Sequence, residues 1–110
     1  MPDLKSLKQA ILAECDEDYV GLWSVIRDVE EFLPKKDENA IREQVLNLLR
    51  ELLAAGEIKA GFPTKEGGFR SLRSTPDRIM ARIEKEWLVG HRPTIGEGLW
   101  FTTARNPSRR

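Results

Sequence analysis

The stretch that decides the fold is Asp37–Pro63, which reads DENAIREQVLNLLRELLAAGEIKAGFP. Its apolar residues recur at the spacing of one face of an α-helix, namely at Ile41, Val45, Leu48, Leu49 and Leu52. Asp37 precedes this stripe, and its carboxylate can accept hydrogen bonds from the first free backbone N–H groups of a helix. Gly56 stands where a helix closes with a left-handed residue. The stretch therefore predicts one long helix between Asp37 and Gly56.

A strand is predicted directly after that helix. Ile58, Ala60 and Phe62 alternate with other residues at the period of a half-buried strand. A long helix, a glycine stop and an immediate strand are typical of the third helix and the first wing strand of a winged helix-turn-helix. The rest of the chain is interpreted around this unit.

The residues before Asp37 predict two more helices. The first is capped by Asp3, buries Leu4, Leu7, Ile11 and Leu12, and ends near Cys15. The short β-branched and aromatic stretch Tyr19–Trp23 predicts an edge strand. Ser24 is then expected to cap a second helix, which Pro34 ends because its ring blocks another helical turn. The buried stripe of this second helix is expected to be Val25, Ile26, Val29, Phe32 and Leu33.

After Pro63 the sequence predicts a turn, a helix and a final strand. Residues 64–68 form the turn, and no strand is expected directly after it. Residues 74–77 form a strong helix start with Thr75 as the cap and Pro76 in the first turn. That helix is expected to bury Ile79, Met80, Ile83 and Trp87 and to stop at Gly90, before a loop at 91–93. Residues 98–103 are aromatic and β-branched, and we expect them to pair antiparallel with residues 57–62.

The predicted fold class is therefore α+β and winged helix-turn-helix-like. Three N-terminal helices are followed by a small antiparallel sheet, with a fourth helix inserted in the wing. Residues 1–103 are expected to form a single domain, and residues 104–110 a disordered basic tail.

The net charge of the 110 residues is zero, but the two halves differ. Residues 1–56 carry 7 basic and 12 acidic side chains, whereas residues 57–110 carry 11 basic and 6 acidic ones. The half that contains the helix-turn-helix pattern is thus acidic, which disfavours contact with nucleic-acid phosphates. One cysteine excludes an internal disulfide, and no apolar run is long enough to cross a membrane. A cytoplasmic protein without membrane contact is expected.

The sequence predicts no catalytic, cofactor-binding or metal-binding residues. His91 is the only histidine, and Cys15 falls on a buried helical stripe, so a nucleophile and a base are not expected to meet. The paired carboxylates, such as Glu30 and Glu31, lie on predicted solvent faces, where no burial raises the pKa for acid–base catalysis. We therefore expect a protein that is not an enzyme.

Three surfaces are candidates for binding. A DNA-binding role would use the outward residues of the helix after Asp37, namely Asn39, Arg42, Gln44 and Asn47, although Glu38 and Glu43 would repel phosphates. A basic face for an acidic partner is formed by Lys65, Arg70, Arg73, Arg78, Arg82 and Lys85. An acidic face for a basic partner is formed by Glu14, Asp16, Glu17, Asp18, Glu30 and Glu31. The residues do not choose between the two charged faces.

A family resemblance suggests a partner. Residues 48–63, Gly67-Gly68-Phe69, residues 83–87 and Leu99-Trp100-Phe101-Thr102 resemble small bacterial winged-helix-like proteins of largely uncharacterised function, over Tyr19 to Thr103. These are similar to immunity proteins of contact-dependent growth inhibition toxin systems. The resemblance implies a cytoplasmic protein-binding module that binds and neutralises a cognate bacterial toxin domain. We expect a monomer or weak homodimer, and from the acidic first half we expect no nucleic-acid partner. The alternatives are a winged-helix DNA-binding transcriptional regulator and a homodimeric structural protein that uses Trp23 or Trp100.

Overall fold

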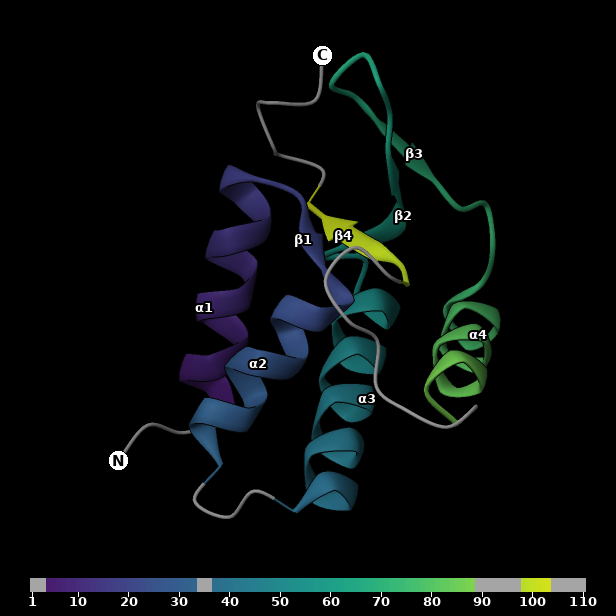
Figure 1. The fold of residues 1–110 in the computed structure, drawn as a ribbon. Helices are drawn as coiled ribbons and strands as arrows, with labels where there is room; N and C mark the ends of the chain where they lie inside the picture. Colours follow the sequence, from purple (N-terminus) through teal and green to yellow (C-terminus); the bar gives the residue numbers. More distant parts are fainter. Residues whose placement is uncertain (1–3, 34–36, 89–97, 104–110) are drawn as a thin grey trace.

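The computed structural model describes residues 4–33, 37–88 and 98–103 (Figure 1). Within these ranges the chain forms four α-helices and one four-stranded antiparallel sheet, so the α+β class is confirmed. The helices are α1 (Leu4–Glu17), α2 (Leu22–Phe32), α3 (Glu38–Ala54) and α4 (Pro76–Leu88). The strands are β1 (Val20–Gly21), β2 (Lys59–Pro63), β3 (Phe69–Ser71) and β4 (Trp100–Thr102).

The last strand lies in the interior of the sheet, because the strand order is β1-β4-β2-β3. Phe101 of β4 is the partner of Val20 on one side and of Ala60 on the other, both antiparallel. The pairing expected between residues 98–103 and residues 57–62 is therefore confirmed. Strand β4 pairs with β1, which precedes α2, and with β2, which follows α3. The sheet therefore joins the N-terminal and C-terminal parts of the described chain.

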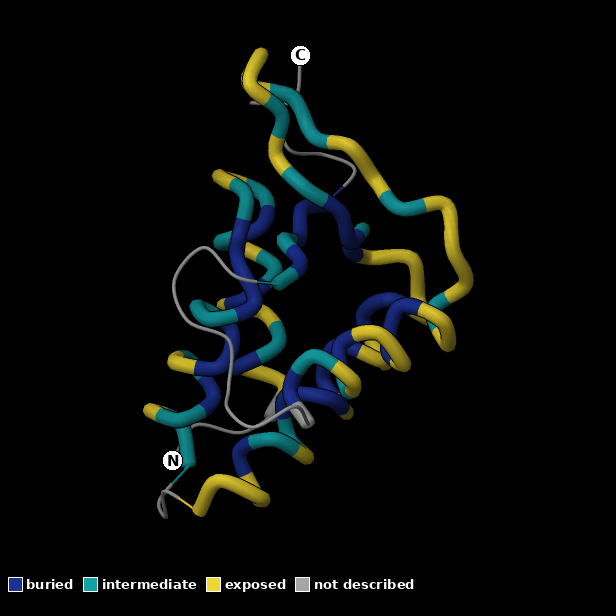
Figure 2. The backbone as a smooth tube through the Cα atoms, turned by 45° about the vertical axis from the view of Figure 1, so that its right-hand side comes forward, coloured by how far each residue is buried: buried dark blue, intermediate teal, exposed yellow. Residues whose placement is uncertain are grey.

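Helix α3 is the central helix of the fold and packs against both α2 and α4 (Figure 1). Its predicted stripe is fully buried, and the predicted α4 residues Ile79, Met80, Ile83 and Trp87 join the same hydrophobic cluster. Leu99 and Phe101 are 0 % exposed and connect the sheet to this core. Figure 2 shows the helices buried on their inward faces and exposed on their outward ones. Removal of this apolar area from water is the main source of stability.

Three predicted helix boundaries are confirmed by local geometry. The Asp37 carboxylate accepts the Asn39 N–H at 3.0 Å, as an N-cap does. Gly56 has a φ of 73°, the left-handed conformation in which glycine avoids the penalty of a side chain. At the start of α4, the Thr75 hydroxyl accepts the Arg78 N–H at 3.3 Å.

The predicted strand Tyr19–Trp23 is too long, and the predicted cap at Ser24 is wrong. The strand contains only Val20 and Gly21, and α2 begins at Leu22 with Gly21 as the N-cap residue, whose cap has no side-chain hydrogen bond. Leu22 is 0 % exposed, so the helix starts early enough to add this residue to the buried face of α2. The Leu22 N–H also donates to the Leu99 carbonyl at 3.0 Å, which fixes the start of α2 on the sheet.

The expectation that no strand follows the turn at 64–68 is also wrong. The chain returns as β3, which pairs with β2 through Gly61 with Ser71 and Phe62 with Arg70. Gly67 takes a φ of 87°, and the Thr64 N–H donates to the Gly68 carbonyl at 2.9 Å, so the reversal is tight. Strand β3 has only three residues, none of them buried, so it carries no apolar alternation that would predict it.

Some predictions fall outside the described residues. These are the cap at Asp3, the helix stop at Pro34, the stop at Gly90, the loop at residues 91–93 and the tail at residues 104–110.

Candidate functional site: an acidic groove with two tryptophans

A surface groove of about 350 Å³ lies where the end of α1, β1, the start of α2 and the start of β4 meet. We call it the Trp groove. Its lining residues are Glu14, Glu17, Asp18, Tyr19, Val20, Gly21, Trp23, Ser24, Arg27 and Trp100. The groove thus combines part of the predicted acidic face with aromatic residues from two distant segments.

Two tryptophans form the aromatic part of the groove. The rings of Trp23 and Trp100 meet edge to face, with centroids 4.6 Å apart and planes at 84°, a favourable geometry for aromatic pairs. Trp23 lies against Gly21, where a Cβ would come within 1.8 Å of the indole ring. Gly21 is also the cross-strand partner of Trp100, so one glycine makes room for the whole arrangement. Both tryptophans are half-buried.

Three carboxylates line the groove beside the tryptophans. Glu17 and Asp18 are exposed at the end of α1, and the Asp18 carboxylate also accepts the Tyr19 N–H at 2.7 Å. Glu14 is half-buried, and burial, together with a hydrogen bond to Asp28 and the charge of that carboxylate, raises its pKa to about 7. Arg27 opposes this shift. The groove is therefore negatively charged, and it becomes more negative when Glu14 loses its proton.

Tyr19 connects the groove to the β2–β3 hairpin. Its hydroxyl donates to the Gly67 carbonyl in the hairpin turn at 2.9 Å, and its ring lies 5.1 Å from that of Phe69. The position of the hairpin turn thus depends on a residue that lines the Trp groove.

The structure divides the predicted acidic face. Glu14, Glu17 and Asp18 line the groove, whereas the Asp16 carboxylate accepts a hydrogen bond from the Thr103 hydroxyl. Glu30 and Glu31 lie near the other end of α2, away from the residues that line the groove. Sequence reasoning missed the joint position of Trp23, Trp100 and Arg27 with these carboxylates. The packing of α2 on α1 brings Trp23 and Arg27 there, and the pairing of β1 with β4 brings Trp100.

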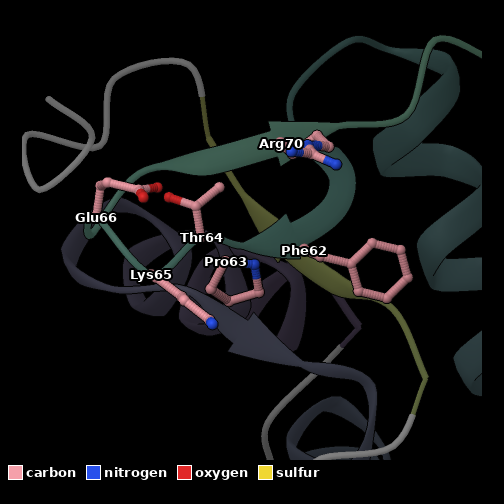
Figure 3. Close-up of a pocket in the computed structure, with 6 residues that line it drawn as sticks. All are labelled: Phe62, Pro63, Thr64, Lys65, Glu66 and Arg70. Carbon is pink, nitrogen blue, oxygen red and sulfur yellow. The ribbon is translucent and has the colours of Figure 1, made fainter.

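All six residues of the predicted basic face are exposed, on the hairpin, the linker after it and α4. Lys65 and Arg70 line a second hollow, of about 470 Å³, together with Phe62, Pro63, Thr64 and Glu66 (Figure 3). The Arg82 guanidinium lies 5.4 Å from the centre of the Phe62 ring and also pairs with Glu86, four residues later on α4, at 3.3 Å. Phe62 is the cross-strand partner of Arg70, so both side chains project from the same face of the hairpin, the face on which Arg82 contacts Phe62. Arg73, Arg78 and Lys85 do not line this hollow.

The predicted DNA-reading residues do not share one exposed surface. Asn39 and Asn47 are exposed on α3, with Glu43 between them on the same face. Arg42 and Gln44 are half-buried, and the Arg42 Nε is buried without a hydrogen-bond partner in the described part of the chain. Asn47 accepts a hydrogen bond from Arg50 at 3.3 Å.

Three further features of the described residues are the surroundings of Cys15, the placement of side chains that can ligate a metal, and the length of the helices. Cys15 is 0 % exposed, as predicted, and its burial, with the charges of Glu14 and Asp16, raises its pKa to about 12, so it stays a thiol at neutral pH. No group of three or more metal-ligating side chains occurs within residues 4–33, 37–88 and 98–103. None of the helices in these ranges combines the length and apolar character that a membrane span requires.

No protein-family model matches the chain, and no curated protein or solved structure is significantly similar to it. The assignment of function therefore depends on the chemistry of the surfaces described above.

Proposed function

We propose that this chain is a non-catalytic protein-binding module that holds a basic partner in the Trp groove. The partner of this kind that the sequence resemblance suggests is a bacterial toxin domain, which the chain would neutralise in the cytoplasm as an immunity protein. The single observation that carries the proposal is the Trp23–Trp100 pair, half-buried beside the carboxylates of Glu14, Glu17 and Asp18.

Tryptophan and tyrosine are enriched among the residues that dominate binding energy, especially where a polar rim excludes water around them. The Trp groove has this composition, with aromatic rings in its lining and exposed carboxylates at Glu17 and Asp18. A lysine or arginine of the partner would place its alkyl chain against the indoles and its charge near the carboxylates. A nuclease toxin with a basic, phosphate-binding cleft has this chemistry, so a protein in the groove would compete with its nucleic-acid substrate.

The finer fold assignment belongs to the same proposal. We assign α2 and α3 as the helix-turn-helix and β2, β3 and β4 as a wing into which α4 is inserted. The element order supports this assignment, since β2 follows α3 within a few residues and β3 and α4 separate it from β4. In this view a DNA-binding scaffold serves to bind another polypeptide.

The alternative function, a winged-helix DNA-binding regulator, requires α3 to enter the major groove. Three features favour the protein-binding role over it. Helix α4 packs on α3, and the Arg42 Nε is buried. On the exposed face of α3, Glu43 lies between Asn39 and Asn47. A carboxylate at that position would meet the negative potential of DNA.

Co-purification with a co-expressed toxin domain tests the proposal. Glu17→Lys combined with Asp18→Lys reverses two exposed charges of the groove, and we expect it to weaken the complex at least about tenfold and more strongly at low salt. The matched control is Glu30→Lys combined with Glu31→Lys, which makes the same charge change on α2 outside the groove. We expect the control to retain binding.

Two results would contradict the proposal. One is equal loss of binding in the groove variant and the control variant. The other is a salt-sensitive, sequence-specific shift of duplex DNA that Asn39→Ala and Asn47→Ala abolish, because it would assign the chain to the regulator class.

A further inference from the structure

The sheet has an open edge at β3, away from the Trp groove. Strand β3 pairs with β2 on one side, and no strand of the described ranges pairs with its other side. The Leu72 N–H donates to the Ala60 carbonyl at 2.8 Å, and the Thr64 N–H donates to the Gly68 carbonyl at 2.9 Å. With Phe62 opposite Arg70, these bonds show which residue pairs of β2 and β3 are hydrogen-bonded to each other. Because ladder pairs alternate in antiparallel strands, the N–H and C=O groups of Phe69 and Ser71 point to the open edge.

Proteins protect an edge strand by prolines, by a short strand length or by charged side chains. Strand β3 is short and carries the exposed Arg70, so the edge disfavours a basic or identical strand and leaves an acidic one favoured. Residues 69–74 contain no proline, and Arg70, Ser71, Arg73 and Ser74 are all exposed. Strand β1, at the other edge, has only two residues and runs directly into α2. Two hollows adjoin β3: the one of about 470 Å³ that Arg70 lines, and one of about 220 Å³ that Ser71 and Leu72 help to line.

The charges at the edge select its occupant. Arg70 lies within β3 and Arg73 follows it, whereas the charges of Lys65 and Glu66 in the adjoining hollow cancel, so the edge is positive through its two arginines. A second copy of the chain is disfavoured, since antiparallel pairing through Phe69 and Ser71 would place the two Arg70 side chains directly opposite each other. Like charges in that position destabilise a strand pair, whereas a carboxylate there would stabilise it.

We infer that the edge of β3 binds an extended acidic peptide segment, which adds to the sheet as a fifth strand with a carboxylate opposite Arg70. Backbone hydrogen bonds to Phe69 and Ser71 supply affinity, and alternate side chains of the segment occupy the two hollows. This surface differs in charge and position from the Trp groove, so it would bind a second segment, of the same partner or of another. The inference does not depend on the proposed function.

The test uses a short synthetic peptide that alternates glutamate and valine, and a control peptide that alternates lysine and valine. We expect the glutamate peptide alone to bind and to slow amide hydrogen exchange at Phe69 and Ser71. Arg70→Glu should weaken it at least about tenfold and let the lysine peptide bind instead. Arg78→Glu is the matched control, because it makes the same charge change at an exposed residue of α4, and it should change affinity less than about twofold.

A backbone variant separates strand addition from simple charge attraction. Ser71→Pro removes an N–H that points away from β2, so the β2–β3 pairing is retained while the edge loses a donor. We expect this variant to keep the folded amide spectrum and to lose binding of the glutamate peptide.

Four results would overturn the inference. They are unchanged binding in Ser71→Pro, protection confined to amides outside β3, no binding by the glutamate peptide, and protection of the β3 amides by duplex DNA but not by the peptide. If the unliganded protein forms dimers in which the amides of Phe69 and Ser71 exchange slowly, the edge binds a second copy of the chain instead. Because the Trp groove variants leave β3 untouched, each proposal can fail while the other stands.

Discussion

The indole N–H of Trp87 donates to the Glu38 carboxylate at 3.3 Å and so ties the last turns of α4 to the first turn of α3. Trp87 is 5 % exposed, and its ring closes the core between these helices. Glu38 also meets the positive end of the α3 dipole, so one carboxylate stabilises two features. This contact holds α4 along α3.

The contact between Trp87 and Glu38 predicts a measurable coupling. Trp87→Phe keeps an aromatic ring but removes the donor, and Glu38→Ala removes the acceptor. In a double-mutant cycle of urea-induced unfolding we expect the two substitutions to couple by about 1.5 kcal/mol, the lower end of the net contribution of a hydrogen bond to a charged group. Additive effects would show that the contact does not stabilise the fold.

Gly21→Ala tests whether one glycine positions the tryptophan pair. The backbone at Gly21 (φ −79°, ψ 158°) suits alanine, so the cost comes from the new Cβ, which would lie 1.8 Å from the Trp23 ring. We expect the indole to move, at a cost of about 1–3 kcal/mol for overpacking, with a change in tryptophan fluorescence.

The control for this substitution is Gly56→Ala. Gly56 has a φ of 73°, and no atom lies within 4 Å of the place that an alanine Cβ would take. The variant should therefore lose about 1 kcal/mol through backbone strain while the fluorescence is unchanged. Unaltered emission in Gly21→Ala would contradict the described position of Trp23.

Glu14 gives the protein a pH-dependent stability. Burial and the neighbouring Asp28 raise its pKa from 4.5 to about 7 in the folded state, so the folded protein holds this proton more tightly than the unfolded chain. Stability should therefore decrease as pH rises from about 4.5 to about 7 and should level off above that. The loss should be on the order of 1 kcal/mol, since solvent screens the half-exposed carboxyl. Urea unfolding of the wild type and of Glu14→Gln across this range measures it, and the variant should show a flatter profile.

Tyr19→Phe isolates the bond between the hairpin turn and the groove. The substitution removes the hydroxyl that donates to Gly67 and keeps the ring contact with Phe69. We expect faster amide hydrogen exchange at Thr64 and Gly67, and a loss of about 0.5–1.5 kcal/mol in stability. Val20→Ala, at the buried neighbour, should instead lower global stability and affect exchange throughout the core.

The correct and incorrect predictions differ in the range of the interactions that decide them. Helix α3 was predictable because Asp37, its apolar stripe and Gly56 act within one segment. The start of α2 was predicted too late, because the burial of Leu22 and its bond to Leu99 outweighed the β propensity of Tyr19–Trp23. Strand β3 was missed for the same reason, since it depends on pairing with β2 and on the contact with Tyr19.

The sequence by itself determined the presence of the four helices, the caps at Asp37 and Thr75, the buried stripes of α3 and α4, and the pairing of residues 98–103 with residues 57–62. Spacing and capping are local properties. It also determined the unequal charge of the two halves of the chain. Only the tertiary structure decided which charged residues share a surface. The β1–β4 register brings Trp100 to Trp23 and the α1 carboxylates, and the β2–β3 register brings Arg70 to Phe62 and Arg82. Such contacts join residues far apart in the chain, and no periodicity within one segment encodes them.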